Sequence, residues 1–211
     1  KDAGLNPENG APLVYDKDGK KVSNVGSIDE LKYSGTTRPP YTASLINRFR
    51  YKGLSLSFMF IYNGGHVLRD EISPYLTGSV TSNISKKAMN HWKKPGDEKI
   101  TNIPSIPAGN PNEINIQLPV EGYVAMSPYA MYNQSDLRVA DTDFIRCRQI
   151  SLQYDLPDAW VNKIGVRRAS VNASLANPFF VAFDKAWEGR DPETANWPAR
   201  RTVSCSLTLN F

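Results

Sequence analysis

The final stretch of the chain, RTVSCSLTLNF at residues 201–211, alternates strictly between polar and apolar side chains from Thr202 onward. Successive side chains of a β-strand point to opposite faces, so this stretch predicts a strand with one apolar and one hydroxyl-rich face. Such a strand suits either a soluble β-sandwich or a transmembrane barrel, which has lipid on one side and a polar lumen on the other. At a rise of about 3.3 Å per residue and a tilt of about 40°, the strand climbs about 28 Å, near the height of a barrel's lipid-facing band. Its uncharged apolar face consists of Val203, Cys205, Leu207, Leu209 and Phe211.

Four further strands are predicted upstream of this one. Residues 43–51 and 54–62 form a hairpin, because only Lys52 and Gly53 separate them. The apolar side of the second of these strands holds Leu54, Leu56, Phe58 and Phe60, followed by Tyr62.

Residues 143–155 and 166–177 form a second pair of strands, joined by a helical turn that starts at Pro157. The apolar residues of 143–155 change parity along the strand, which predicts a β-bulge near Gln149. Cys147 and Cys205 fall on strands separated by a third one, about 10 Å apart, which is too far for a disulfide.

The connections between these five strands alternate in length. Short turns follow the first and third strands, whereas residues 1–41, 63–142 and 178–198 are long connections rich in Pro, Gly and Asn. If every strand crosses one membrane, the short turns share one side and the long loops the other, as in outer-membrane barrels. Within the loops, Asp18-Gly19 predicts a tight hairpin turn, and Ser82-Asn83 can cap a short helix.

Aromatic residues follow the same division between the two ends of the strands. We expect one girdle at the short-turn end and a second at the long-loop end, because aromatic rings favour both membrane interfaces. The first girdle would contain Tyr51, Tyr154, Trp160 and Phe211, and the second Tyr62, Phe144, Phe179 and Phe180.

Composition excludes several other classes of protein. The net charge of +4 comes from scattered basic pairs rather than one basic helix, so nucleic acid is not an expected partner. Two Cys and two well-separated His give no metal site, and no cofactor is expected. The chain has paired carboxylates at Asp141 and Asp143 but no GxSxG, HExxH or phosphate-binding loop, so it is not expected to be an enzyme.

Six blocks of sequence resemble, in the right order, the carboxy-terminal part of SusC/RagA-like TonB-dependent outer-membrane transporters. Each block is a weak signal alone, whereas the ordered set is specific and covers most of the chain. The blocks are AGLNPENGAPLVYDKDGK at 3–20, YKGLSLSFMFIYNGGHVLRD at 51–70, HWKKPGDEKITNIP at 91–104, DTDFIRCRQISLQYDLP at 141–157, ANPFFVAFDKAWEGRDPE at 176–193 and WPARRTVSCSLTLNF at 197–211.

The resemblance implies an all-β chain that contributes the last five strands of an antiparallel, twenty-two-stranded transmembrane β-barrel. Residues 1–211 would form one part of this barrel domain, without the plug. The predicted parts are an extracellular segment (1–41), a strand hairpin (43–62), a long extracellular loop (63–142), a strand pair with a periplasmic helical turn (143–177), an extracellular loop (178–198) and the terminal strand (199–211).

The resemblance also implies a location and partners. The chain would lie in the outer membrane of a Gram-negative bacterium and take part in the uptake of oligosaccharides or peptides. Its partners would be the outer-membrane lipid, the rest of the barrel and plug, a SusD-like surface lipoprotein, and the TonB complex through the missing amino-terminal part. A dimer of transporter–lid pairs is a further assembly that fits the resemblance.

Five polar or aromatic residues are candidates for contact with the substrate or the lid protein: Trp187, Arg190, Asp191, Arg146 and Arg148. The alternative is that they hydrate the lumen and pack the loop, and Asp191 before Pro192 suits a turn. An alternative for the whole chain is a soluble β-sandwich that binds carbohydrate, with Trp92, Trp187 and Trp197 as platforms for sugar rings.

Overall fold

The computed structural model describes residues 1–23, 25, 30–72, 86–106, 116–117, 125–126, 128–195 and 197–211. The chain divides into two units. The first comprises Lys1–Gly35 and Arg69–Ala140, and the second comprises Thr36–Leu68 and Asp141–Phe211. Each unit is built from two stretches that are distant in the sequence.

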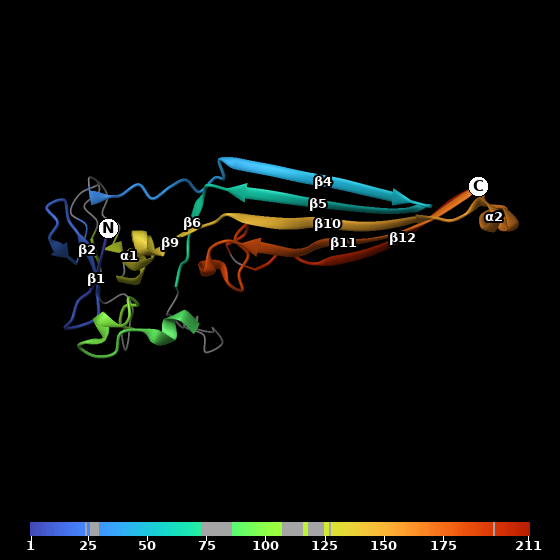
Figure 1. Ribbon diagram of the computed structural model, residues 1–211. Helices are drawn as coiled ribbons and strands as arrows, with labels where there is room; N and C mark the ends of the chain where they lie inside the picture. Colours follow the sequence, from blue (N-terminus) through green and yellow to red (C-terminus); the bar gives the residue numbers. More distant parts are fainter. Residues whose placement is uncertain are drawn as a thin grey trace. The chain divides into compact units, whose positions relative to one another are not determined.

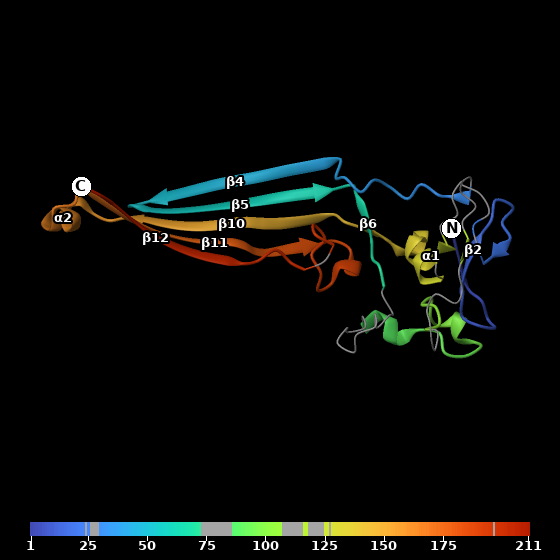
Figure 2. The ribbon, with the colours of Figure 1, turned by 180° about the vertical axis from the view of Figure 1, so that it is seen from behind.

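The second unit is organised around one five-stranded antiparallel sheet with the order β12-β11-β10-β5-β4 (Figure 1). Figure 2 shows the same strands from behind. The predicted strands and their neighbours are therefore confirmed. The strands are β4 (Tyr41–Tyr51), β5 (Leu54–Gly64), β10 (Phe144–Asp155), β11 (Arg168–Ala182) and β12 (Thr202–Asn210).

The sheet has one apolar and one polar face, and the register shows how the strands share them. Across antiparallel strands, directly opposite residues lie on the same face. Leu56 is opposite Phe49 on β4 and Leu152 on β10, and Val171 on β11 is opposite Leu207 on β12. On the other face Ser57 is opposite Ser151, which is opposite Ser174 on β11.

In the described part of the chain, no second sheet encloses the apolar face in the way that a sandwich requires. Leu207 is 62% exposed, and Leu45, Phe49 and Val203 are also exposed. A second sheet packed on this face would bury such side chains. The exposure of the predicted apolar residues therefore contradicts the soluble-sandwich alternative.

The predicted bulge lies where the sequence places it. Cys147 is opposite Phe60 and Gln149 is opposite Met59, so Arg148 is the extra residue on β10. The bulge resets the alternation and brings Cys147 and Ile150 to the same, apolar face.

The fourth strand is longer than predicted, and its end at Asn177 was wrong. β11 continues to Ala182, because a register shift opposite the β10 bulge accommodates Asn177 and Pro178. Asn177 has a φ of 51°, and proline within a sheet is tolerated at bulges since no ladder hydrogen bond is lost there. The loop predicted at 178–198 therefore begins after Ala182 and contains η6 (Lys185–Trp187).

Both short connections have the predicted form. Lys52 and Gly53 have φ values of 44° and 83°, as a two-residue hairpin turn with left-handed residues requires. After β10 the chain forms α2 (Asp158–Val161) and η5 (Asn162–Ile164), and Gly165 ends the turn with a φ of 76°.

The first unit contains short elements around two small apolar clusters. One cluster consists of Ile72, Ala88, Ile103, Tyr129 and Tyr132, and Val14 packs on Met131 in the other. The elements are β1 (Asp2–Leu5), β2 (Pro12–Tyr15), β3 (Lys21–Val22), η2 (Lys86–Asn90), η3 (Asp97–Lys99), β7 (Ile116–Gln117), β8 (Ala125–Met126), α1 (Pro128–Gln134) and η4 (Asp136–Arg138).

The predicted turn at Asp18-Gly19 is confirmed, because it joins the paired strands β2 and β3 and Gly19 has a φ of 78°. The helix expected after Ser82-Asn83 is described only from Lys86 to Asn90, where it is a 3-10 helix; its predicted cap lies outside the described residues. The chain passes between the two units within β6 (Val67–Arg69) and β9 (Val139–Asp141). No helix among the described residues has both the length and the hydropathy of a membrane span.

Candidate functional site

Arg146 is the centre of the most buried charged cluster in the second unit. It projects from the polar face of β10 and is 1% exposed. One guanidinium nitrogen donates a hydrogen bond to Oδ1 of Asp191, and Nε lies 2.8 Å from Oε2 of Glu193. The bulged Arg148 also pairs with Glu193, through Oε1. Two arginines of one strand are thus neutralised by two carboxylates of the loop after β11.

Asp191 is held in a single orientation by backbone donors. It is completely buried, and its two carboxylate oxygens accept hydrogen bonds from the N–H groups of Glu193 and Ala199, each at 3.0 Å. The first of these bonds closes the turn that the sequence predicts at Asp191-Pro192. A buried carboxylate is stable when it is both paired and hydrogen-bonded, so this cluster fixes the loop onto the end of the sheet.

Phe144 and Phe180 enclose the Arg146 guanidinium. Its Cζ lies 5.6 Å from the centre of the Phe144 ring and 5.1 Å from that of Phe180, within the range of a cation–π contact. Both rings lie at the predicted end of the sheet but on its polar face, whereas Tyr62 and Phe179 lie on the apolar face. The prediction that Phe144 and Phe180 belong to an aromatic girdle at the membrane interface was therefore wrong, because both rings pack around a buried cation on the polar face.

Trp187 and Arg190 form the neighbouring part of the same loop. The Trp187 ring is buried, its Nε1 donates to the carbonyl oxygen of Asp141 at 2.7 Å, and the guanidinium of Arg190 stacks on it at 5.1 Å. The side chain of Asp184 accepts a hydrogen bond from the N–H of Ala186 and so caps η6. These contacts fold the loop around its own tryptophan.

The structure thus places the five predicted contact residues in two groups, with partners that the sequence did not predict. Arg146, Arg148 and Asp191 meet through Glu193, which was not a candidate although it directly follows Asp191-Pro192. Trp187 and Arg190 pair with each other. Contact of these residues with a substrate or lid protein stays a prediction.

Asp143 is a second unpredicted anchor at this end of the sheet. It accepts hydrogen bonds from the Tyr62 hydroxyl at 2.8 Å and from the N–H of Gly65 at 2.6 Å. Partial desolvation acts to raise the pKa of Asp143, but these hydrogen bonds outweigh it and hold the pKa below its usual value. The carboxylate therefore stays charged and ties β5 to the start of β10.

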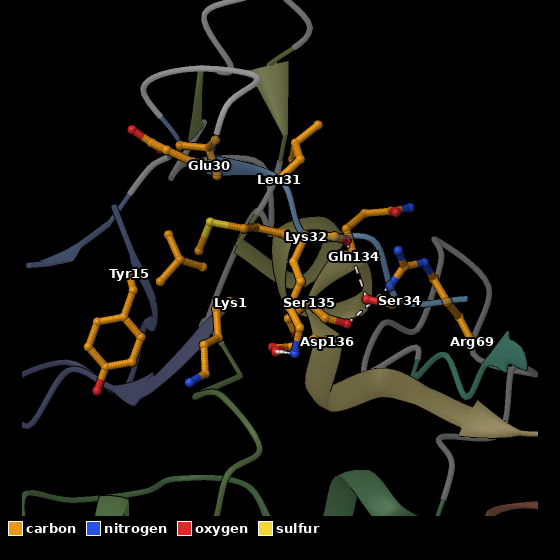
Figure 3. Close-up of a pocket in the computed structure, with 13 residues that line it drawn as sticks. Lys1, Tyr15, Glu30, Leu31, Lys32, Ser34, Arg69, Gln134, Ser135 and Asp136 are labelled. Atoms are coloured by element: carbon orange, nitrogen blue, oxygen red, sulfur yellow. Dashed lines mark hydrogen bonds and ion pairs between the residues drawn. The ribbon is translucent and has the colours of Figure 1, made fainter. Parts of the chain in front are cut away.

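A groove of about 340 Å³ lies in the first unit (Figure 3). Apolar side chains such as Met131 line one part, and a Lys32–Asp136 ion pair at 3.4 Å lines another. Asp136 also accepts a hydrogen bond from the N–H of Asp2 at 2.7 Å. Partial burial acts to raise the pKa of Asp136, but this hydrogen bond and the nearby positive charges outweigh it and lower the pKa. Arg69 donates to the carbonyl of Ser135 at 3.0 Å.

The predicted lipid-facing residues all lie on the apolar face or at its end. Leu54, Leu56, Cys205, Leu207 and Phe211 are exposed, and Phe58 and Phe60 are half-buried by neighbouring rings. The three tryptophans of the sugar-binding alternative are not comparable platforms. Trp92 and Trp187 are buried, whereas Trp197 is exposed. Within the described part of the chain, no three His, Cys, Asp or Glu residues are grouped to hold a metal ion.

Comparison with known proteins identifies relatives of both the sequence and the fold. No protein-family model matches the chain. The TonB-dependent receptor P39 of Formosa agariphila is 30% identical over 177 residues, which are 82% of this chain and 15% of that receptor. The chain therefore spans less than a sixth of the length of this curated relative.

Solved structures of the RagAB peptide transporter share the fold. One matches with a TM-score of 0.67 and 21% identity, and the "open-open" state of the RagAB peptide importer with 0.68 and 21%. Each match covers 100% of this chain and 22% of the other chain. Sequence and fold together place this chain among the TonB-dependent receptors.

Proposed function

We propose that the chain forms part of the barrel wall and loops of a TonB-dependent importer in the outer membrane of a Gram-negative bacterium. The observation that carries this proposal is the two-faced sheet. Its apolar face is exposed along all five strands, while its other face is rich in Ser, Thr, Asn and Arg. Lipid against the apolar face and a water-filled lumen against the polar face would suit both faces.

The edges of the sheet support the same proposal. β4 and β12 are its outer strands, and an unpaired strand edge within a hydrocarbon layer leaves backbone N–H and C=O groups unsatisfied. Further strands of the same barrel would pair with both edges and close it. We infer that the barrel has twenty-two strands and encloses a plug.

The proposed cargo class rests on the relatives and on the family resemblance of the sequence, and not on the groove or the ion cluster. One solved relative is a peptide transporter, so we propose uptake of peptides or of oligosaccharides. In this arrangement the loop after β11 stays anchored through Arg146 and Asp191, and its exposed surface contacts cargo or a SusD-like surface lipoprotein. The TonB complex would engage the plug, and two transporter–lid pairs could assemble as a dimer.

Uptake by cells tests the proposal. The full-length protein is expressed in a Gram-negative host that lacks its own peptide and oligosaccharide receptors, and accumulation of fluorescent oligopeptides and oligosaccharides is measured. We expect accumulation of one class that stops when TonB is deleted or the proton gradient is collapsed. Accumulation that continues without TonB would contradict the proposal, and so would fractionation of the folded protein away from the outer membrane.

A further inference from the structure

The helical turn between β10 and β11 carries large apolar side chains that point away from the protein. Trp160 in α2 is 60% exposed and Ile164 in η5 is 72% exposed. A turn whose sole task was to reverse the chain would gain nothing from two such residues in water, because each leaves apolar surface solvated. Exposed apolar groups of this size mark a surface that is covered by something else.

The packing of the turn shows which side of the sheet it covers. Val161 and Val166 are buried against Ala169, with Leu156 beside them. Ala169 is opposite Leu209 on β12 and so belongs to the apolar face. The buried side of the turn is therefore attached on the apolar side of the sheet's end.

Several cations lie close to the exposed pair in the sequence or at the same end of the sheet. Lys163 lies between Trp160 and Ile164 in the sequence, and Arg167 follows the turn; both are exposed. At the adjacent hairpin Lys52 is exposed and stacks on the Tyr51 ring at 5.3 Å, and the Gly53 carbonyl accepts from the N–H of Asp155 at 2.9 Å.

The acidic groups at this end are fewer. Asp155 is paired with Arg50 at 3.7 Å, and Asp158 lies in the first turn of α2. Arg168 adds a further exposed cation at the start of β11. The local excess of positive charge is complementary to an anionic surface.

We propose that the segment 156–167 is an interfacial anchor, in which Trp160 and Ile164 insert into the headgroup region of the bilayer and Lys163 and Arg167 bind anionic phospholipid headgroups. Tryptophan favours this depth because its ring is apolar and its N–H is polar, and lysine and arginine near the surface are attracted to anionic lipid. This inference rests on the proposed membrane-wall function, since it requires the apolar face to be in lipid.

Fluorescence quenching tests the position of Trp160. The full-length protein is reconstituted into phosphatidylglycerol–phosphatidylcholine vesicles that contain lipids brominated either near the headgroup or near the chain ends. The contribution of Trp160 is the difference between the wild type and Trp160→Phe. We expect stronger quenching by the shallow bromines than by the deep ones. Trp197→Phe is the matched control, because Trp197 is exposed in the loop at the other end of the sheet and should be quenched by aqueous iodide instead.

A fluorophore on Cys205 separates failure of the anchor from failure of the membrane-wall function. Cys205 is exposed on the apolar face of β12, whereas Cys147 is buried and should not react. If the Cys205 probe is quenched by brominated lipid and Trp160 is not, the anchor is refuted and the wall function stands. If neither is quenched, the wall function itself is refuted. Protection of Trp160 from both bromolipid and iodide would show that a protein partner covers the turn, which also overturns the anchor.

The role of anionic lipid is tested with a pair of charge variants. We expect phosphatidylglycerol to raise the thermal unfolding midpoint above that in phosphatidylcholine alone, and the double variant Lys163→Gln/Arg167→Gln to lose most of this difference. Lys17→Gln/Lys20→Gln removes the same charge from an exposed hairpin of the first unit and should keep the difference. An equal lipid effect in both double variants would overturn headgroup binding.

Discussion

Leu207 and Ser206 are neighbours on β12 that face opposite sides of the sheet. Leu207 is opposite Val171 on the apolar face, and Ser206 is opposite Asn172 on the polar face. Both are exposed, so neither substitution meets a tightly packed core. Any difference between the two positions therefore reports the solvent that each face contacts, and not the packing around it.

We expect Leu207→Arg to destabilise the full-length protein by about 2 to 4 kcal/mol, because it places a charge near the middle of the bilayer. Ser206→Arg should be nearly neutral, since its side chain points to the lumen. The free energy of unfolding in urea from phospholipid vesicles, together with the fraction assembled in the outer membrane, measures both. Equal losses for the two variants would argue against lipid on the apolar face.

Arg146 and Arg148 make a second matched pair, since both contact Glu193 but only Arg146 is deeply buried. Arg146→Met leaves the buried Asp191 without its cation and should cost about 3 to 5 kcal/mol. Arg148→Gln removes a partly exposed pair and should cost at most about 1 kcal/mol. Limited trypsin cleavage at Arg200-Arg201 measures release of the loop. Equal cleavage rates for the two variants would show that Arg146 does not anchor the loop after β11.

The turns and the bulge are the elements that sequence predicts best, because each is encoded by a few adjacent residues. Gly53 and Gly165 take positive φ values where the pattern of strands requires a reversal, and the change of parity before Ile150 is visible in the alternation itself. The end of β11 was not predictable in this way. Pro178 is normally a sign that a strand ends, and only the paired bulge on β10 makes it compatible with a continuous strand.

The ion cluster at the loop after β11 could not be predicted from the sequence. Arg146 was a visible candidate, and Phe144 shares its parity, but nothing local in the sequence joins Arg146 to Asp191, which is 45 residues away. The packing of the first unit could not be predicted from the sequence either, because its apolar clusters assemble from short stretches without hydrophobic periodicity.

The tight turn between β4 and β5 gives a prediction that compares two glycines, Gly53 and Gly165. A Cβ on Gly53 would lie 2.9 Å from the backbone oxygen of Asp155, whereas a Cβ on Gly165 meets nothing within 4 Å. Both glycines have positive φ, so both Gly→Ala variants bear a conformational cost of about 1 to 2 kcal/mol. We expect Gly53→Ala to be the more destabilising in urea unfolding, because it also displaces the end of β10 from β5. A larger loss for Gly165→Ala would contradict the close approach of the two strands.

At the scale of the whole molecule, the proposed function requires that lipid covers the apolar face of the five-stranded sheet. The chain supplies five neighbouring strands with matched faces, and its relatives are receptors and transporters several times its length. Closure of the proposed barrel requires that the apolar face lies in lipid. A second protein that covers this face would rule out that arrangement.

A cysteine scan along β12 in the full-length protein tests this point most directly. In a Cys205→Ser background, single cysteines from Thr202 to Asn210 are labelled with a small fluorophore, reconstituted into vesicles and quenched with brominated lipid. The account predicts a period of two, with strong quenching at 203, 205, 207 and 209 and weak quenching at the positions between them. Uniform quenching, or equal access of aqueous iodide to both sets of positions, would contradict it.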